Sequence, residues 1–286
     1  MYIGDKRVPI YEVKTNFSQR WNPTAPNRMN NGVATIGLEG KVEIKLQANF
    51  AFMNEISIRP TSRDVKYVVD NSRRVITFTI SDVGQYTIEL RSGRTLHLFV
   101  NKMDVYDVPK SAIVFEPGVH NKSNDNRINN NNEIVLTSGN VYYLSPGCFL
   151  DARFYARSRN NITICGPGYI DGSMFERDAN KGTTLVPVDI NFVNNLTLKD
   201  FAVIDPAGWC FNIYFDTQVH IENTKIISSR SNGDGISLQS CQHVLVENVF
   251  VRSWDDSLVI KNYVNLDKKG KNYFGICPFH DDHTPS

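Results

Sequence analysis

The chain has 286 residues, with 31 lysines and arginines against 30 aspartates and glutamates, so its formal net charge is +1. This balance argues against the basic surface that a nucleic-acid groove needs, and we expect no nucleic-acid partner. No apolar run approaches the roughly 18 residues of a membrane span, and no secretory signal is visible at the start, so no membrane role is expected.

Residues 1–108 have the pattern of a module of short strands. Polar and apolar residues alternate over residues 41–46, 75–80, 86–90 and 96–100, and turn signals separate these segments. Alternation with a period of two predicts strands with one buried face, which pair as an antiparallel sandwich. No acid pair or nucleophile constellation occurs there. We therefore expect a β-sandwich-like accessory domain without chemistry of its own.

Residues 109–286 have strand patterns but no helical stripe. The sandwich pattern breaks at residues 104–109, where we place the domain boundary. A polar run at residues 121–132 has too little apolar content to pack and is expected to be an exposed loop. Parallel strands without crossover helices can be closed only by coiling. The sequence therefore predicts an all-β fold, with a right-handed parallel β-helix over residues 109–286 preceded by the sandwich-like domain.

The cysteines are widely spaced, odd in number and form no Cys-x2-Cys pair. They are Cys148, Cys165, Cys210, Cys241 and Cys277. This pattern argues against a disulfide framework or a zinc site, and buried thiols pack well at strand edges. A cluster at residues 277–283 contains cysteine, histidine and aspartate, but it lies in a tail that does not repeat the coil. We expect core cysteines, no metal, no cofactor and a β-helix that is incomplete at its C-terminus.

A repeat between residues 208 and 261 predicts how the coils stack. Residues 219–223 match residues 244–248, and the apolar pairs at 211/213, 236/238 and 258/260 follow one another at offsets of 25 and 22 residues. Repeats of this length indicate stacked coils. If Ile236 lies under Leu258, then Asp234 lies beside Asp256, with Asp255 next to it. A single aspartate here would suit a structural turn. Three carboxylates at the same edge of two adjacent coils would repel one another, and this cost favours a functional interpretation.

Such a group of acids suits glycoside hydrolysis. One protonated acid donates to the leaving oxygen, while a carboxylate acts on water or on the sugar carbon. Two carboxylates that hold a water opposite one acid describe an inverting hydrolase, and crowding favours the raised pKa that the acid requires. Trp209, at the stacked position below Asp234, and Trp254 offer aromatic faces to sugar rings, although packing explains them equally well. Lys261 could bind a uronate carboxylate. The alternative interpretation is that it is a solvent-exposed residue at the end of a strand.

The same stretch resembles the polygalacturonase-type glycoside hydrolases, a family of pectin-degrading β-helix enzymes. Their signature of Asn-Thr-Asp-Gly-Ile-Asp, a strand, Gly-Asp-Asp-Cys and a strand ending in Ile-Lys is similar to residues 232–237, 243–248, 254–257 and 258–261. The resemblance implies that Asp255 is the general acid and that Asp234 and Asp256 hold the attacking water, without metal or cofactor.

The sequence departs from this family at several positions. Gly233, Trp254 and Ser257 replace the family's threonine, glycine and cysteine. The family's Gly-His-Gly segment and Arg-x-Lys clamp are not found, and His280 lies only at about the distance of the family's histidine. A sandwich ahead of a β-helix also resembles the dextranase and isopullulanase family, which acts on neutral glucans.

The prediction is thus an inverting glycoside hydrolase acting on a polysaccharide. Polygalacturonate or pectin is the first candidate polymer, and dextran or pullulan is the alternative. A non-catalytic glycan-binding β-helix and a polysaccharide lyase are the competing classes, and Arg252 and Lys261 are the cations available to a lyase. We expect a monomer that acts outside the cell or in the periplasm, because a polymer substrate cannot be imported, although no signal sequence supports this location.

Overall fold

The computed structural model describes residues 1–15, 29–52, 56–90, 93–103, 108–175, 185–261, 267–269 and 272–274. Within these ranges the chain is almost entirely β-structure, with one three-residue 3-10 helix, η1 (Thr61–Arg63). In this described part, no helix has the length and apolar character needed to cross a membrane. The prediction of an all-β protein is confirmed.

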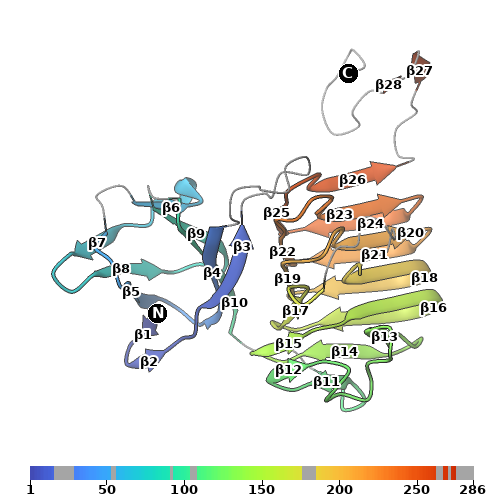
Figure 1. Cartoon of the computed structure of the whole chain (residues 1–286), viewed down its shortest axis with the longest axis horizontal. Helices are drawn as coiled ribbons and strands as arrows, with labels where there is room; N and C mark the ends of the chain where they lie inside the picture. The colour runs from blue at the N-terminus through green and yellow to red at the C-terminus, as the bar shows by residue number, and fades with distance from the viewer. Residues whose placement is uncertain are drawn as a thin grey trace.

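Two five-stranded sheets form the N-terminal part, drawn in blue and cyan (Figure 1). The first has the order β2 (Lys6–Arg7), β1 (Tyr2–Ile3), β5 (Val42–Gln47), β8 (Val75–Ile80), β7 (Tyr67–Asp70). The second has the order β3 (Tyr11–Thr15), β4 (Met29–Leu38), β10 (Thr95–Lys102), β9 (Gly84–Leu90), β6 (Ile56–Arg59). Ile44, Phe78 and Leu98 belong to the apolar core between the sheets. We expected a wholly antiparallel sandwich, and this was wrong in one place, because β4 and β10 pair in parallel.

The rest of the chain is a parallel β-helix with three faces, whose coils stack from β11 at one end to β26 at the other (Figure 1). Parallel connections of this kind are right-handed because of strand twist. The first face contains β13 (Glu133–Val135), the first half of β16 (Arg153–Cys165), the first half of β18 (Val188–Lys199), β20 (Phe211–Tyr214), β23 (Ile236–Gln239) and β26 (Leu258–Lys261).

The second and third faces complete each coil. The second contains β11 (Ile113–Phe115), β14 (Val141–Leu144), the second halves of β16 and β18, β21 (Thr217–Glu222) and β24 (Gln242–Glu247). The third contains β12 (Gly118–His120), β15 (Cys148–Leu150), β17 (Tyr169–Asp171), β19 (Ala202–Ile204), β22 (Lys225–Ile227) and β25 (Phe250–Arg252). Beyond the coils, β27 (Asp267–Lys269) and β28 (Asn272–Phe274) pair antiparallel.

The predicted register between coils is confirmed. Phe211 pairs with Ile236, which pairs with Leu258, and Val219 pairs with Val244. The inward residues of successive coils fill a continuous apolar core. Four of the cysteines, 148, 165, 210 and 241, are buried as expected and form no disulfide with one another, while Cys277 lies outside the described residues.

Residues with positive φ stack at the corners of the coils. At the bend from the first to the second face the equivalent residues of successive coils are Phe192, Phe215 and Ser240, then Asn195, Gln218 and His243. At the bend from the second to the third face they are Asp200, Asn223 and Asn248, and all nine have φ between 50° and 72°. Asparagine and aspartate tolerate this conformation through their short polar side chains, whereas a phenylalanine in it is unfavourable by roughly 1–2 kcal/mol. The stacked ladders on both sides of each corner hold these residues in place.

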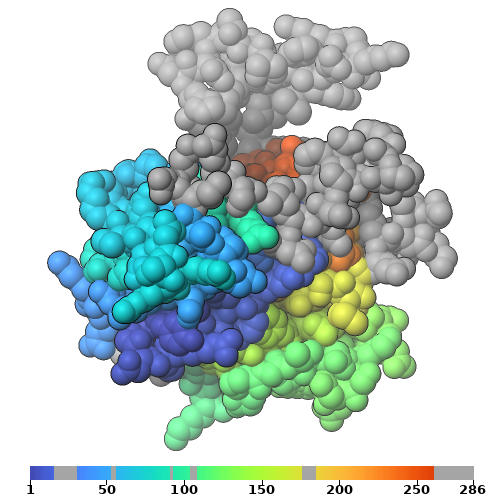
Figure 2. Space-filling view, turned by 60° about the vertical axis from the view of Figure 1, so that its left-hand side comes forward, coloured from blue at the N-terminus to red at the C-terminus, as the bar shows by residue number. Residues whose placement is uncertain are grey.

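The sandwich packs against the third face of the β-helix, and the two parts lie directly against each other (Figure 2). An apolar cluster crosses the boundary, with Phe99 from the sandwich against Tyr169 and Ile227 from the β-helix. Within this interface Lys225 is buried, and its Nζ donates to Asn101 Oδ1 at 2.8 Å. The two parts therefore share both an apolar core and buried polar contacts.

The polar run at residues 121–132 is more ordered than expected. Ile128 is buried in the core of the β-helix, and Asp125 accepts hydrogen bonds from Arg127 and from His120 Nδ1 at 2.8 Å. The Arg127 guanidinium lies 4.0 Å above the Phe115 ring. The buried Ile128 and the ion pair of Asp125 with Arg127 thus anchor the run at the start of the β-helix. The asparagines at 129–131 are exposed, as predicted.

Candidate active site

Three aspartates lie at the corner between the third and first faces. Asp234 precedes β23, and Asp255 and Asp256 precede β26. The Gly235 N–H donates to Asp256 O at 2.8 Å, in line with the pairing of Ile236 with Leu258. Asp234 and Asp256 therefore occupy equivalent positions on adjacent coils, one strand spacing of about 4.8 Å apart along the backbone. The structure brings the three predicted acids together at one corner.

The three carboxylates differ in burial. Asp234 is 8% exposed, whereas Asp255 and Asp256 are exposed. Burial, and secondly the negative charge of Asp234, hold the pKa of the Cys210 thiol well above its usual range. Asp234 is thus buried at the corner, while Asp255 and Asp256 are in contact with solvent. Groups of the same type therefore lie in chemically different environments.

Two glycines allow the turn around Asp234 to form. A Cβ at Gly235 would lie 2.4 Å from the Ser257 carbonyl oxygen of the next coil, and a Cβ at Gly233 would lie 2.6 Å from both the Arg230 carbonyl oxygen and Ser228 Oγ. Contacts this short leave no room for a side chain. Gly233, where the resembled family has threonine, is therefore required by the local packing of this chain.

Serine hydroxyls connect the turn of Asp234 to the turn of the acid pair. Ser228 Oγ donates to Gly233 O at 2.5 Å and accepts from the Trp254 N–H at 3.3 Å. Ser253 Oγ donates to Asp255 O at 2.8 Å and lies 2.9 Å from Ser257 Oγ. The bond from Trp254 to Ser228 joins neighbouring coils, and the other three bonds each fix the backbone of one turn that carries the acids.

Arg230, which sequence reasoning missed, supports the same corner. Its Nη2 lies 3.2 Å from Asp205 Oδ2 and donates to Ser173 O at 3.2 Å, while Nη1 donates to Phe175 O. Burial raises the pKa of Asp171, its hydrogen bonds with Ser173 oppose the rise, and the Asp205 charge adds a smaller upward contribution. Arg230 lies four residues before Asp234, but its partners are on earlier coils, so sequence spacing could not identify its role.

The sandwich also contacts the strand that leads to the acid pair. Arg252, the last residue of β25, donates through Nη1 to His97 Nε2 at 3.0 Å. The acceptor role of Nε2 places the imidazole hydrogen on Nδ1, which lies 3.0 Å from Thr87 Oγ1. Burial lowers the pKa of His97 to about 3, so the ring is neutral. Arg252, considered above as a cation available to a lyase, is therefore directed at the sandwich.

The remaining predicted site residues are only partly described. The register places Trp209 level with Asp234, and the Cys210 N–H donates to Asp234 O at 3.0 Å. Trp209 and Trp254 are both half-buried at this corner. The Lys261 backbone pairs with Gln239 in β26, but its side chain lies outside the described residues, as does His280. The roles given to these four residues remain predictions.

Comparison with protein families gives a match at the C-terminus. Residues 245–286 match the family model described as a CHC2 zinc finger. The chain is 57% identical over 28 residues to the DNA primases of Staphylococcus epidermidis (strain ATCC 12228) and Staphylococcus aureus (strain COL), a segment that covers 10% of this chain and 5% of those proteins. The chain thus spans about a twentieth of the length of these relatives. Residues 245–261 of the matched range are β-helix strands and turns in this structure.

A four-ligand zinc site cannot be assembled from the cysteines that the structure describes. By residue type, Cys277 and His280 would supply the first two ligands that the family description indicates. The other four cysteines are buried in the β-helix, and a thiol in that core could bind zinc only if the coils opened. The described residues therefore supply no cysteine ligand to a zinc ion at this position.

Comparison with solved structures gives β-helix proteins. Dex49A from Penicillium minioluteum aligns with a TM-score of 0.52 and 12% identity over 76% of this chain and 52% of that protein. A family 28 exopolygalacturonase from Yersinia enterocolitica aligns with a TM-score of 0.39 and 15% identity over 64% of this chain and 51% of that protein. The chain spans about half the length of each. The likeness to Dex49A, which extends over three quarters of the chain, shows that the two proteins share their fold.

Proposed function

We propose that this protein is an inverting glycoside hydrolase that cleaves a polysaccharide at the corner formed by Asp234, Asp255 and Asp256. The register of β23 with β26 carries this proposal, because it sets the backbones of Asp234 and Asp256 one strand spacing apart, with Asp255 next to Asp256 in the chain. A structural turn would use asparagine and avoid the repulsion. The fold shared with Dex49A and the resemblance of the motifs to polygalacturonase-type enzymes support the same reaction class.

The proposed roles are those that the resemblance to polygalacturonase-type enzymes implies for the three matching aspartates. Asp255, exposed at the mouth, donates its carboxyl proton to the glycosidic oxygen as the bond from that oxygen to the anomeric carbon breaks. A water molecule held by Asp234 and Asp256 attacks the anomeric carbon from the opposite face, and its proton passes to one of these carboxylates. The product has inverted configuration. The proton that Asp255 loses is regained from solvent after product release.

Charge at the corner favours a neutral polymer over a pectic one. Two described cations close to the acids in sequence are engaged elsewhere, Arg230 with Asp205 and Arg252 with His97. A polymer with a carboxylate on every sugar would bring further negative charge to the three acids, and like charges at a binding site oppose association. We therefore rank dextran- or pullulan-type glucans ahead of polygalacturonate.

The outward side of the first face has the chemistry that a neutral sugar needs. Asp189 Oδ1 accepts from Asn212 Nδ2 at 2.9 Å, and Gln239 Nε2 donates to Asn212 Oδ1 at 3.1 Å, so a hydrogen-bonded row of one carboxylate and two amides crosses three coils. Arg153, which contacts Asp189 Oδ2 at 3.2 Å, is also paired with Glu133. Amide groups both donate and accept, which suits sugar hydroxyls.

The test is release of reducing ends from dextran, pullulan and polygalacturonate by the wild-type chain and by Asp255→Asn. Loss of the proton donor should abolish hydrolysis of the one polymer that is cleaved, and NMR of the first product should give the inverted anomer. Asp64→Asn, an exposed aspartate of the sandwich that pairs with Lys66, is the matched control and should keep full activity.

Two outcomes would contradict the proposal. Equal activity of Asp255→Asn and wild type would show that Asp255 is not the general acid. A product of retained configuration would show that Asp234 and Asp256 do not direct a water molecule to the anomeric carbon in a single inverting step. Cleavage of polygalacturonate alone would keep the reaction and reverse the ranking of polymers. Because such polymers are too large to enter a cell, we also propose an extracellular or periplasmic location.

A second candidate function concerns the C-terminal residues alone and is favoured by the family match at residues 245–286. In this proposal Cys277 and His280 are two ligands of a zinc finger like that of the DNA primases. A cobalt titration would test it, because thiolate ligation gives an intense charge-transfer band that Cys277→Ser should remove. Absence of that band from the wild-type chain would count against this candidate.

A further inference from the structure

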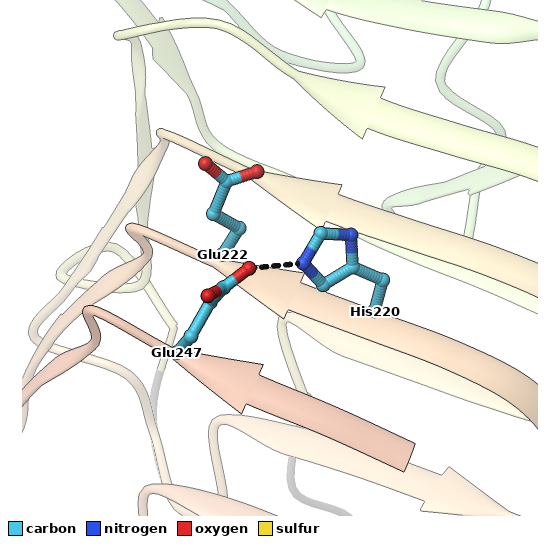
Figure 3. Close-up of side chains that lie close together, drawn as sticks. All are labelled: His220, Glu222 and Glu247. Atoms are coloured by element: carbon cyan, nitrogen blue, oxygen red, sulfur yellow. Dashed lines mark hydrogen bonds and ion pairs between the residues drawn. The ribbon is translucent and has the colours of Figure 1, made fainter. Parts of the chain in front are cut away.

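A second group of potential ligands lies on the second face, away from the aspartates. His220 and Glu222 belong to β21, and Glu247 belongs to β24 on the next coil. Glu222 and Glu247 pair in the parallel register, so their side chains stack. His220 lies two residues before Glu222 and therefore points to the same side of the strand. The three side chains converge from two neighbouring strands (Figure 3).

The stacked glutamates need compensating charge. Carboxylates one strand spacing apart repel each other. Lys199, the equivalent residue of the preceding coil, contacts Glu222 Oε2 at 2.8 Å, and this bond raises the pKa of the lysine. His220 Nε2 lies 2.8 Å from Glu247 Oε1. The lysine holds one oxygen of Glu222, which leaves Oε1 as a potential ligand, and the only partner of the second glutamate among the described residues is an imidazole.

The donor atoms lie close enough for one ion. One atom from each of His220, Glu222 and Glu247 lies within 4.8 Å of the other two. Ligand bonds to zinc are about 2.0–2.2 Å long, so modest side-chain rotation would bring the donors into contact with a single ion. The side chains of His220, Glu222 and Glu247 are 36%, 28% and 43% exposed, which leaves them free to rotate.

We propose that His220, Glu222 and Glu247 bind one divalent transition-metal ion, with water as a fourth ligand. One imidazole and two carboxylates suit zinc and its neighbours, and their charges neutralise a divalent ion. Calcium would need six to eight oxygen ligands, which this group does not provide. The ion joins β21 to β24 and replaces the repulsion between the glutamates by shared coordination, while Lys199 stays on the outer oxygen of Glu222.

The neighbouring coils do not repeat this ligand set. The residues that pair with His220 are Thr197 on the preceding coil and Leu245 on the following one. Lys199 stands where the preceding coil would need a second glutamate. One ion per chain is therefore expected at this face, and the proposal is independent of the hydrolase activity.

The test is titration of the folded chain with Zn²⁺ by calorimetry and with Co²⁺ by absorption, in a chain carrying Cys277→Ser, His280→Asn and His283→Asn so that the tail contributes no cysteine or histidine ligand. We expect one equivalent of metal and a cobalt spectrum without a thiolate band. His220→Asn and Glu247→Gln should each weaken binding at least tenfold. His243→Asn, an exposed histidine on β24 outside the group, should bind as the parent does.

Three results would overturn the proposal. They are no binding by a chain that is folded by circular dichroism, equal affinity in His220→Asn and its parent, or a loss of affinity in His243→Asn as large as in His220→Asn. A thiolate band in the cysteine-substituted tail background would place the ion on a cysteine of the β-helix and would overturn it as well.

Discussion

Lys225 at the interface between sandwich and β-helix should make stability depend on pH. Its side chain is 2% exposed, and its Nζ donates to Asn101 Oδ1 at 2.8 Å and to Asp200 O at 3.1 Å. Burial lowers its pKa from 10.5 to about 7, and the Asp200 charge only partly opposes this. Between these pH values the unfolded chain holds a proton that the folded chain has lost, so stability rises with pH across this window.

The size of the effect follows from proton linkage. A difference of one bound proton changes the free energy of unfolding by about 1.4 kcal/mol for each pH unit, or about 3 kcal/mol between pH 8 and 10. Lys225→Met keeps the length of the side chain and removes the titrating group. It also removes the donors to Asn101 and Asp200, but that loss does not vary with pH and leaves the slope unaffected.

Urea unfolding of wild type and Lys225→Met at pH 6 to 10 measures this difference. Thiols with raised pKa values, such as Cys148 at about 12 and Cys165 at about 11, lower stability in both proteins as pH rises, and subtraction cancels their contribution. Lys66→Met, at an exposed lysine, is the control and should parallel the wild type. Parallel curves for wild type and Lys225→Met between pH 7 and 10 would refute the argument.

Two further predictions concern the β-helix. Gly235→Ala should lower the free energy of unfolding by about 1–3 kcal/mol and reduce hydrolysis, because its Cβ would meet the Ser257 carbonyl oxygen. Gly37→Ala is the control, since its Cβ would have ordinary contacts at 3.4 Å or more, and it should lower the melting temperature only slightly. Equal shifts of the melting temperature in the two variants would contradict the reasoning. Asp216 is fully buried, and burial raises its pKa from 3.8 to about 7 in the folded protein. The loss of stability that this shift causes is therefore absent below pH 4 and reaches its full size above pH 7. Asp216→Asn, which keeps an oxygen acceptor for the Val193 N–H, should therefore raise the melting temperature at pH 8 but not at pH 4, and an equal effect at both pH values would exclude this cause.

The period of the strands and the repeat were sufficient to predict the fold and the register of the acids. Apolar residues such as Ile213, Leu238 and Ile260 must face the core on every coil, and a slip of one residue would expose all of them. The offsets of 25 and 22 residues therefore align Asp234 with Asp256 without any tertiary information. The polar run at 121–132 was misjudged because one buried residue, Ile128, and the ion pair of Asp125 with Arg127 are enough to anchor it.

Local periodicity is thus enough to predict the two modules, the parallel coils and the corner where three aspartates meet. The partners of polar residues across coils and domains could be found only from the folded structure. Arg252 and His97 are 155 residues apart, and Arg230 and Asp205 are 25 apart on different coils. Such contacts depend on how the sandwich packs against the third face and on where each corner turns, because side-chain hydrogen bonds need donor and acceptor atoms within about 3.2 Å. The stacking of His220, Glu222 and Glu247 follows from the predicted register, but the approach of their donor atoms needed side-chain positions.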